Sequence, residues 1–231
     1  MFWYTSPMNR SIVSILALIV LIGVGYIVYT TAQEGGPSTG GSQTEGTLTE
    51  KNIAQEDQVH AINVTYPQFG LREVDTRVQK AVDVAVDEIR AMPQNPPEMA
   101  SPQNTLDGQY GRTHIEKDIA SVEMRFSVYT GGVHPNLAIV PVNVNRALDQ
   151  DLTLDDALKL IGMTLTDVAT KAKADLTAAL GEDVIFPEGA DPKPEHYSTF
   201  LVDEDSVTFI FQVYQVAPYS AGPQEVTFAR R

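Results

Sequence analysis

The first strong hydrophobic pattern is a run of mostly apolar residues at 11–31, which carries no charged side chain. An α-helix rises about 1.5 Å per residue, so a helix over this run would be about 30 Å long, close to the thickness of the hydrocarbon layer of a bilayer. We therefore expect a transmembrane helix at 11–31, preceded by a short cytoplasmic segment at 1–10. Because Arg10 precedes the run and the next basic residue is Lys51, the positive-inside rule predicts that the C-terminal part lies outside the cytoplasm.

A cleavable signal peptide is the alternative interpretation of the same run. The small residues Thr30, Thr31 and Ala32 would suit a signal peptidase that cleaves near Ala32. The apolar stretch is longer than a typical signal-peptide core, and few basic residues precede it, so we favour the uncleaved anchor. Both interpretations place the rest of the chain outside the cytoplasm.

Hydrophobic periodicity is absent from residues 32–52, which are rich in Gly, Ser and Thr. Such a composition is typical of a flexible linker, so we expect the folded domain at 53–231. Residues 92–107 contain four prolines and also lack periodicity, and we expect a surface loop there.

The folded domain alternates between strand-like and helix-like patterns. Apolar and polar residues that alternate predict strands at 62–66, 121–128, 138–144, 198–202, 206–213 and 225–229. Apolar residues at helical spacing predict helices at 73–91, 154–160 and 165–180. Helices inserted between antiparallel hairpins indicate an α+β fold, with a mainly antiparallel sheet packed against two or three helices.

Local signals refine this picture. Thr153 and Thr164 are each followed three residues later by Asp, as in a capping box, and Gly181 is expected to end the last helix. Pro141 indicates an edge position or a bulge in the strand at 138–144, because proline has no N–H to donate to a neighbouring strand. The strand at 121–128 is expected to have one face in water, formed by Ser121, Glu123, Arg125 and Ser127.

The composition narrows the class of partner. The chain has 16 Lys and Arg against 30 Asp and Glu, a formal net charge of −14, and no cysteine. This charge argues against binding to nucleic acid and favours cationic partners or simple solubility. The lack of cysteine excludes disulfides and thiolate metal sites.

No motif indicates catalysis. The four histidines do not form an HExxH motif, and there is no GxSxG sequence, no glycine-rich phosphate loop and no cysteine nucleophile. We therefore predict no catalytic residue, cofactor or metal ion. Pairs of carboxylates leave a glycan hydrolase open as an alternative, although helix starts and turns explain them better. These pairs are Asp155–Asp156, Glu182–Asp183 and Asp203–Glu204–Asp205.

Two segments rich in Tyr, Gly and Pro, at 129–136 and 214–223, exceed what simple turns require. Rigid segments with exposed tyrosines are typical of contact surfaces, so we predict a recognition surface there. Its candidate residues are Tyr129, Gly131, Gly132, His134, Asn136, Tyr214 and Tyr219.

These segments also carry a family resemblance. TGGVHPN, then LTLDDAL, then VTFIFQVYQVAPYSAGPQEV are similar to the C-terminal domain of the RsiV/PdaC-like family, and VTYPQFGLREVDTRVQKAVDVAVDEI resembles the segment before it. The resemblance covers about 59–228 and implies a non-catalytic α+β module outside the cytoplasm. Known members are a lysozyme-sensing anti-sigma factor and a peptidoglycan deacetylase, whose catalysis belongs to a separate domain.

We therefore expect a single-pass membrane protein whose outer domain recognises cell-wall glycan or an envelope-directed protein such as lysozyme. Only ten residues precede the apolar run, so we expect a tether rather than a signal transducer. A carboxylate-based hydrolase or a deacetylase-related enzyme remains the alternative function, and an assembly subunit of the same membrane is a third. The oligomeric state is not predicted.

Overall fold

The computed structural model describes residues 47–182 and 184–231, which belong to one compact unit. The expected cytoplasmic segment, the transmembrane helix at 11–31 and most of the linker lie outside these residues and stay predictions. None of the described helices is both long and apolar enough to cross a lipid bilayer.

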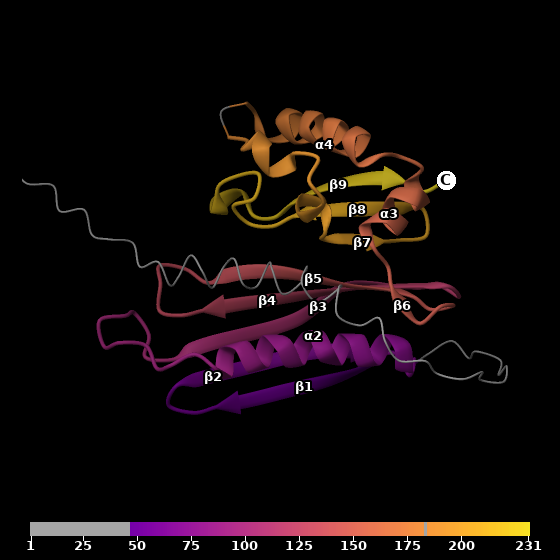
Figure 1. Cartoon of the computed structure of the whole chain (residues 1–231). Helices are drawn as coiled ribbons and strands as arrows, with labels where there is room; N and C mark the ends of the chain where they lie inside the picture. Colours follow the sequence, from indigo (N-terminus) through magenta and orange to yellow (C-terminus); the bar gives the residue numbers. More distant parts are fainter. Residues whose placement is uncertain (1–46, 183) are drawn as a thin grey trace, which may run out of the picture. The chain divides into compact units, whose positions relative to one another are not determined.

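Six strands form a mixed sheet, in which their spatial order follows the sequence (Figure 1). They are β1 (Thr49–Glu56), β2 (His60–Gln68), β3 (Asn104–Ile115), β4 (Ile119–Tyr129), β5 (Asn136–Asn145) and β6 (Gln150–Asp151). β2 and β3 are parallel, and all other neighbouring pairs are antiparallel. A parallel pair requires a crossover connection, and the helix α2 (Arg72–Arg90) lies in this connection.

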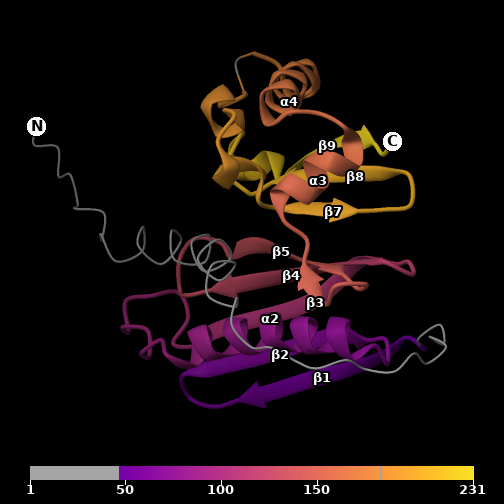
Figure 2. The same ribbon diagram turned by 45° about the vertical axis from the view of Figure 1, so that its right-hand side comes forward.

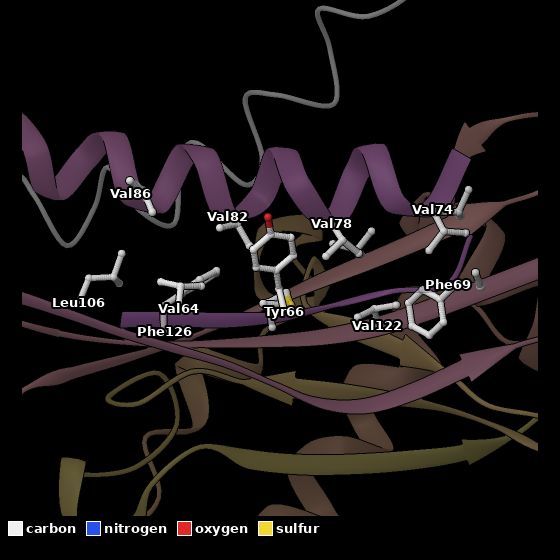
Figure 3. Close-up of a cluster of buried hydrophobic side chains, with 14 of the residues drawn as sticks. Val64, Tyr66, Phe69, Val74, Val78, Val82, Val86, Leu106, Val122 and Phe126 are labelled. Atoms are coloured by element: carbon white, nitrogen blue, oxygen red, sulfur yellow. The ribbon is translucent and has the colours of Figure 1, made fainter. Parts of the chain in front are cut away.

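α2 covers one face of the six-stranded sheet. Its buried residues repeat at helical spacing and are Val74, Val78, Val82, Val86 and Ile89. They belong to one apolar cluster with side chains from the sheet, among them Val64, Leu106 and Phe126 (Figure 3). The predicted amphipathic helix is confirmed, with each end one residue earlier than expected.

A second sheet of three antiparallel strands follows. It contains β7 (Phe200–Val202), β8 (Ser206–Phe211) and β9 (Gln224–Ala229). Its cover consists of the helices α3 (Leu154–Ile161) and α4 (Leu165–Leu180) and the short 3-10 helices η2 (Pro187–Ala190) and η3 (Pro194–Tyr197). A further 3-10 helix, η4 (Tyr219–Ala221), lies in the connection between β8 and β9. Figures 1 and 2 show α4 on the side of this sheet that faces away from the larger sheet. Tyr197 packs edge-on against Phe209 and Phe211 in its core, with ring centroids 5.4 and 5.5 Å apart.

The starts of α3 and α4 are fixed as the sequence predicts. The side chains of Thr153 and Thr164 accept hydrogen bonds from the backbone N–H groups of Asp156 and Asp167, whose carboxylates accept from the backbone of the two threonines. These reciprocal bonds satisfy N–H groups that a helix start otherwise leaves without partners. Gly181 ends α4 with a φ of 88°, a conformation that favours glycine.

The two sheets meet at β4, β5 and β7. Ile139, Leu201 and Ile210 form a small apolar cluster between them. The Ser121 hydroxyl donates to Asn143 Oδ1 at 2.6 Å and accepts from the backbone N–H of Val202 at 3.0 Å. This contact corrects a prediction: Ser121 and Glu123 do not face water but are buried, because the second sheet covers this half of the polar face of β4.

Pro141 has the edge position that the sequence predicts. β5 pairs with β4 along its length, but with β6 only at Val144 and Asn145. The outer edge of β5 at Pro141 is therefore unpaired among the described residues, and the missing N–H of proline leaves no ladder bond unmade.

The α+β class is confirmed, but three details differ from the prediction. The fold has two sheets, one of them with a parallel pair, instead of a single mainly antiparallel sheet. β1 already begins at Thr49, inside the predicted linker at 32–52, and β3 begins at Asn104, inside the predicted loop at 92–107. Both strands flank β2 and are mostly polar, so backbone pairing with β2 fixes them rather than apolar alternation.

Candidate recognition site

Three rings from two loops form one partly exposed aromatic cluster, which consists of His134, Tyr214 and Tyr219. The rings of His134 and Tyr219 are stacked, with centroids 3.8 Å apart and an angle of 19° between their planes. The Tyr214 ring lies 5.6 Å from Tyr219 and 6.4 Å from His134, measured between centroids. The two segments that the sequence singled out separately therefore meet in space.

Hydrogen bonds fix the orientation of the cluster. His134 Nδ1 lies 2.9 Å from the Pro135 carbonyl oxygen, and His134 Nε2 lies 3.2 Å from the Tyr214 hydroxyl. A carbonyl oxygen only accepts, so Nδ1 carries the proton and Nε2 of the neutral ring accepts from Tyr214. Tyr219 donates its hydroxyl proton to the same Pro135 oxygen at 2.8 Å.

The loop at 130–135, between β4 and β5, presents His134. Gly131 has a φ of 80°, and a side-chain Cβ at this position would lie 2.8 Å from Cβ of Met99. Its carbonyl also accepts from the N–H of Ala100 at 3.4 Å. Glycine is therefore required at 131 by both conformation and space, which explains one of the two consecutive glycines.

The loop between β8 and β9 presents the two tyrosines, and its base is rigid. The Gln215 side-chain amide donates to the carbonyls of Gly189 and His196, while its oxygen accepts from the N–H of Gln212. Val216 and Ala217 follow and are buried. The two tyrosines of the cluster thus lie on a loop that is hydrogen-bonded to η2 and η3.

Tyr214 is held in an unusual backbone conformation. Its φ is 67°, although its side chain is half exposed. An L-residue with a side chain costs about 1–2 kcal/mol in this left-handed region, so the fold retains an exposed tyrosine at a position that would favour glycine. This strain marks Tyr214 as a candidate contact residue.

The other predicted residues flank the cluster rather than belong to it. Tyr129 ends β4 and Asn136 begins β5, and Gly132 lies in the loop between them. Within the described part of the chain these three form no side-chain hydrogen bond or ring contact with the cluster. Sequence reasoning missed Val133, which is 98 % exposed beside His134 at the tip of the loop.

Three of the carboxylates considered for catalysis have structural roles. Asp156 caps α3, and Asp155 lies in its first turn. The turn between β7 and β8 is closed by Asp203, whose N–H donates to the Ser206 carbonyl and whose Oδ1 accepts from the N–H of Glu204. Asp183 lies outside the described residues. In the described ranges no three His, Cys, Asp or Glu side chains gather to hold a metal ion.

β4 carries a buried charge at a position that the sequence predicted to lie in water. The Glu123 side chain is fully buried on β4, and its carboxylate accepts from Arg112 Nε at 2.9 Å and Arg125 Nε at 2.7 Å. Arg112 also forms a bidentate pair with Glu225 on β9, at 2.9 and 2.6 Å. Burial alone would raise the pKa of Glu123, but the bonds and charges of the two arginines outweigh it and hold the pKa below its ordinary value.

Comparison with known proteins supports the predicted resemblance. The chain is 24% identical over 171 residues to the peptidoglycan-N-acetylmuramic acid deacetylase PdaC of Bacillus subtilis, covering 72% of this chain and 37% of PdaC. It therefore spans little more than a third of the length of that relative. It is also 22% identical over 198 residues to the immunogenic protein MPT64 of Mycobacterium tuberculosis, covering 84% of this chain and 86% of MPT64.

A solved structure shares the fold. A DUF3298 family member from Bacteroides fragilis matches with a TM-score of 0.54 at 18% identity, covering 81% of this chain and 92% of that one. Residues 150–230, which include Tyr214 and Tyr219 but not His134, match the family described as "Protein of unknown function (DUF3298)". The resemblance to the RsiV/PdaC-like family is thus confirmed through PdaC, and residues 150–230 of the chain are similar to the DUF3298 family.

Proposed function

We propose that the chain is a membrane-anchored recognition module of the cell envelope, which binds cell-wall glycan through the aromatic cluster. The observation that carries this proposal is the packing of His134, Tyr214 and Tyr219 from two loops on a rigid base. Aromatic rings offer flat apolar faces to the C–H faces of sugar rings, while the polar groups at their edges can bond to sugar hydroxyls. Such a surface suits a ligand that is apolar on its faces and polar at its rim.

The proposed location rests on the sequence and on one relative. The apolar run at 11–31, with Arg10 before it, supports a single-pass anchor with the described domain outside the cytoplasm. PdaC acts on peptidoglycan, as its name states, and this chain resembles 37% of its length. A glycan of the cell wall is therefore the ligand class that fits both the location and the relative.

The module is proposed to be non-catalytic. The described carboxylate pairs cap a helix and close a turn, and the cluster itself holds no carboxylate. The alternative, a carboxylate-based hydrolase or deacetylase-related enzyme of the envelope, would need two carboxylates at a fixed separation on either side of the scissile bond. Hydrolysis or deacetylation of glycan by the purified chain would contradict the proposal.

Charge supports a second candidate ligand. The net charge of −14 favours a cationic, envelope-directed protein such as lysozyme, and this attraction should weaken as salt rises. Stacking on sugar faces should change little with salt, so the salt dependence of binding separates the two ligand classes.

The test measures binding of the detergent-solubilised full chain to purified peptidoglycan sacculi and to lysozyme. We expect His134→Ala and Tyr219→Ala to weaken binding to sacculi at least tenfold, while the exposed control Leu148→Ala binds like the unmodified chain. Leu148 is 63 % exposed and lies in the turn after β5. Undiminished binding by both cluster variants would contradict the glycan proposal, and salt-sensitive binding to lysozyme alone would favour the second candidate.

A further inference from the structure

The face of the six-stranded sheet opposite α2 is only half covered by the second sheet. The other half is an open groove with a volume of about 700 Å³, which side chains from β1 to β5 line. Its main polar residues are Asn63, Thr65, Asp107, Gln109, Arg125 and Ser127. The size lies within the range of known ligand sites.

The chemistry of this groove is that of a sugar site. Backbone N–H and C=O groups in the middle of a sheet are already paired, so a ligand on the face meets side chains only. Here it meets amides and hydroxyls, together with the Arg125 guanidinium, which Glu123 holds at 2.7 Å. Asp107 and Glu50 add negative charge, which disfavours an anionic polymer and leaves a neutral, hydroxyl-rich ligand as the better match.

The groove ends beside the aromatic cluster. Its last lining residue, Leu137, follows Asn136 directly and pairs with Ser127 across the hairpin, whose loop holds His134. Neighbouring strands lie about 4.8 Å apart, so a groove crossing from β1 to β5 is about 19 Å long. This length fits several linked sugar rings rather than one.

We infer that an extended, neutral oligosaccharide lies across the open groove from β1 to β5 and stacks one end on the aromatic cluster. This inference rests on the proposed function and adds to it the length and path of the ligand. The cluster supplies stacking for a terminal ring, and the groove supplies hydrogen bonds for the rings that follow. Affinity therefore grows with the number of sugars until the groove is filled.

The test uses neutral β-1,4-linked N-acetylglucosamine oligosaccharides, which resemble the sugar backbone of peptidoglycan but lack its carboxylates, in separate lengths from the disaccharide upward. Isothermal titration with the full chain in detergent should show long oligosaccharides binding at least tenfold more tightly than the disaccharide. The double variant Gln109→Ala with Ser127→Ala should remove most of this gain, about tenfold in affinity, because two side-chain hydrogen bonds are lost. It should weaken disaccharide binding least, because only one ring of a disaccharide lies beyond the cluster.

A matched control makes the same chemical changes elsewhere. Gln150→Ala with Ser206→Ala alters β6 and β8, outside the groove lining, and should retain the full gain with length. Equal affinity for all lengths, with no effect of the groove variant, would overturn the inference and leave the proposed function intact. Binding to intact sacculi but to no neutral oligosaccharide would assign the site to the muramic-acid carboxylates or the stem peptides and also overturn it. Absence of binding to both sacculi and oligosaccharides would contradict the proposed function itself.

Discussion

The two halves of the polar face of β4 carry the same kinds of residue but have opposite surroundings. Ser121 and Glu123 lie under the second sheet, at 2 % and 0 % exposure. Arg125 and Ser127 continue the same alternation into the open groove. The difference arises because the second sheet, β7 to β9, covers only part of the length of β4. One strand therefore both contacts the second sheet and forms part of a candidate ligand surface.

In the covered half, the buried polar side chains of β4 form hydrogen bonds that stabilise the fold. Every polar group of Ser121 and Glu123 that the cover removes from water meets a partner, in Asn143, Val202, Arg112 or Arg125. The open half has no such partners for Ser127 among the described residues. Buried polar groups that are satisfied stabilise a specific arrangement, whereas exposed ones are free to bind.

Glu123→Gln should have the largest effect on stability. The substitution keeps the shape of the side chain but removes a buried charge between two arginines, and we expect a loss of about 3 kcal/mol in the free energy of unfolding. Urea denaturation measures it. Glu225→Gln removes a partly exposed partner of the same Arg112 and should lose less than about 1 kcal/mol. Equal losses would show that burial does not distinguish the two carboxylates.

Acid should weaken the contacts that Glu123 forms in the covered half. The pKa of Glu123 is lowered in the folded state, so its contribution to stability is complete above the unfolded value of 4.5 and is lost as the pH falls through the folded pKa. Thermal melts between pH 7 and pH 3 should therefore show a steep decline below about pH 4.5. The decline should be shallower in Glu123→Gln, and an identical decline in both proteins would contradict the assignment.

Ser121→Ala and Ser127→Ala compare the two halves with one chemical change. Ser121→Ala leaves the Val202 N–H and Asn143 without their buried partner, and we expect a loss of about 1–2 kcal/mol. Ser127→Ala should change the unfolding free energy by less than about 0.5 kcal/mol. Similar losses at both positions would show that burial under the second sheet does not determine how much a polar side chain of β4 contributes to stability.

Tyr214→Gly should change stability little, although it removes a large side chain. Glycine relieves the left-handed strain while adding chain entropy to the unfolded state, so the unfolding free energy should stay within about 1 kcal/mol of the unmodified value. Leu148→Gly, at a position with ordinary φ, serves as the control and should be destabilised more in a thermal melt. A larger loss for Tyr214→Gly would mean that the ring supports the fold instead of a ligand.

Regular patterns in the sequence predicted the elements that bury an apolar stripe or carry a cap. This group contains α2, α3, α4, β4, β5 and the strands of the second sheet. β1 and β3 were missed because their residues are mostly polar and their positions depend on backbone pairing with β2. The burial of Glu123 was missed for a related reason, since alternation distinguishes two faces but does not say which of them another sheet will cover.

The two loops of the candidate site could be found from composition, but their contact could not. Gly131, Pro135 and the tyrosines are local signals of rigid loops. The stacking of His134 on Tyr219 joins residues far apart in the chain and depends on how the second sheet packs on β5. Val133 and the groove carried no signal, because a lone valine and scattered polar residues on several strands form no pattern within one segment.

Pro141 and the brevity of β6 also affect how copies of this domain meet each other. An incoming strand at the outer edge of β5 would find no N–H at Pro141, and β6 already occupies the last two residues. The opposite edge is different, because β1 presents eight residues whose outer side pairs with no other described strand. Strand exchange or aggregation of crowded molecules would therefore begin at β1, and a single proline placed there is the natural way to make the domain more soluble.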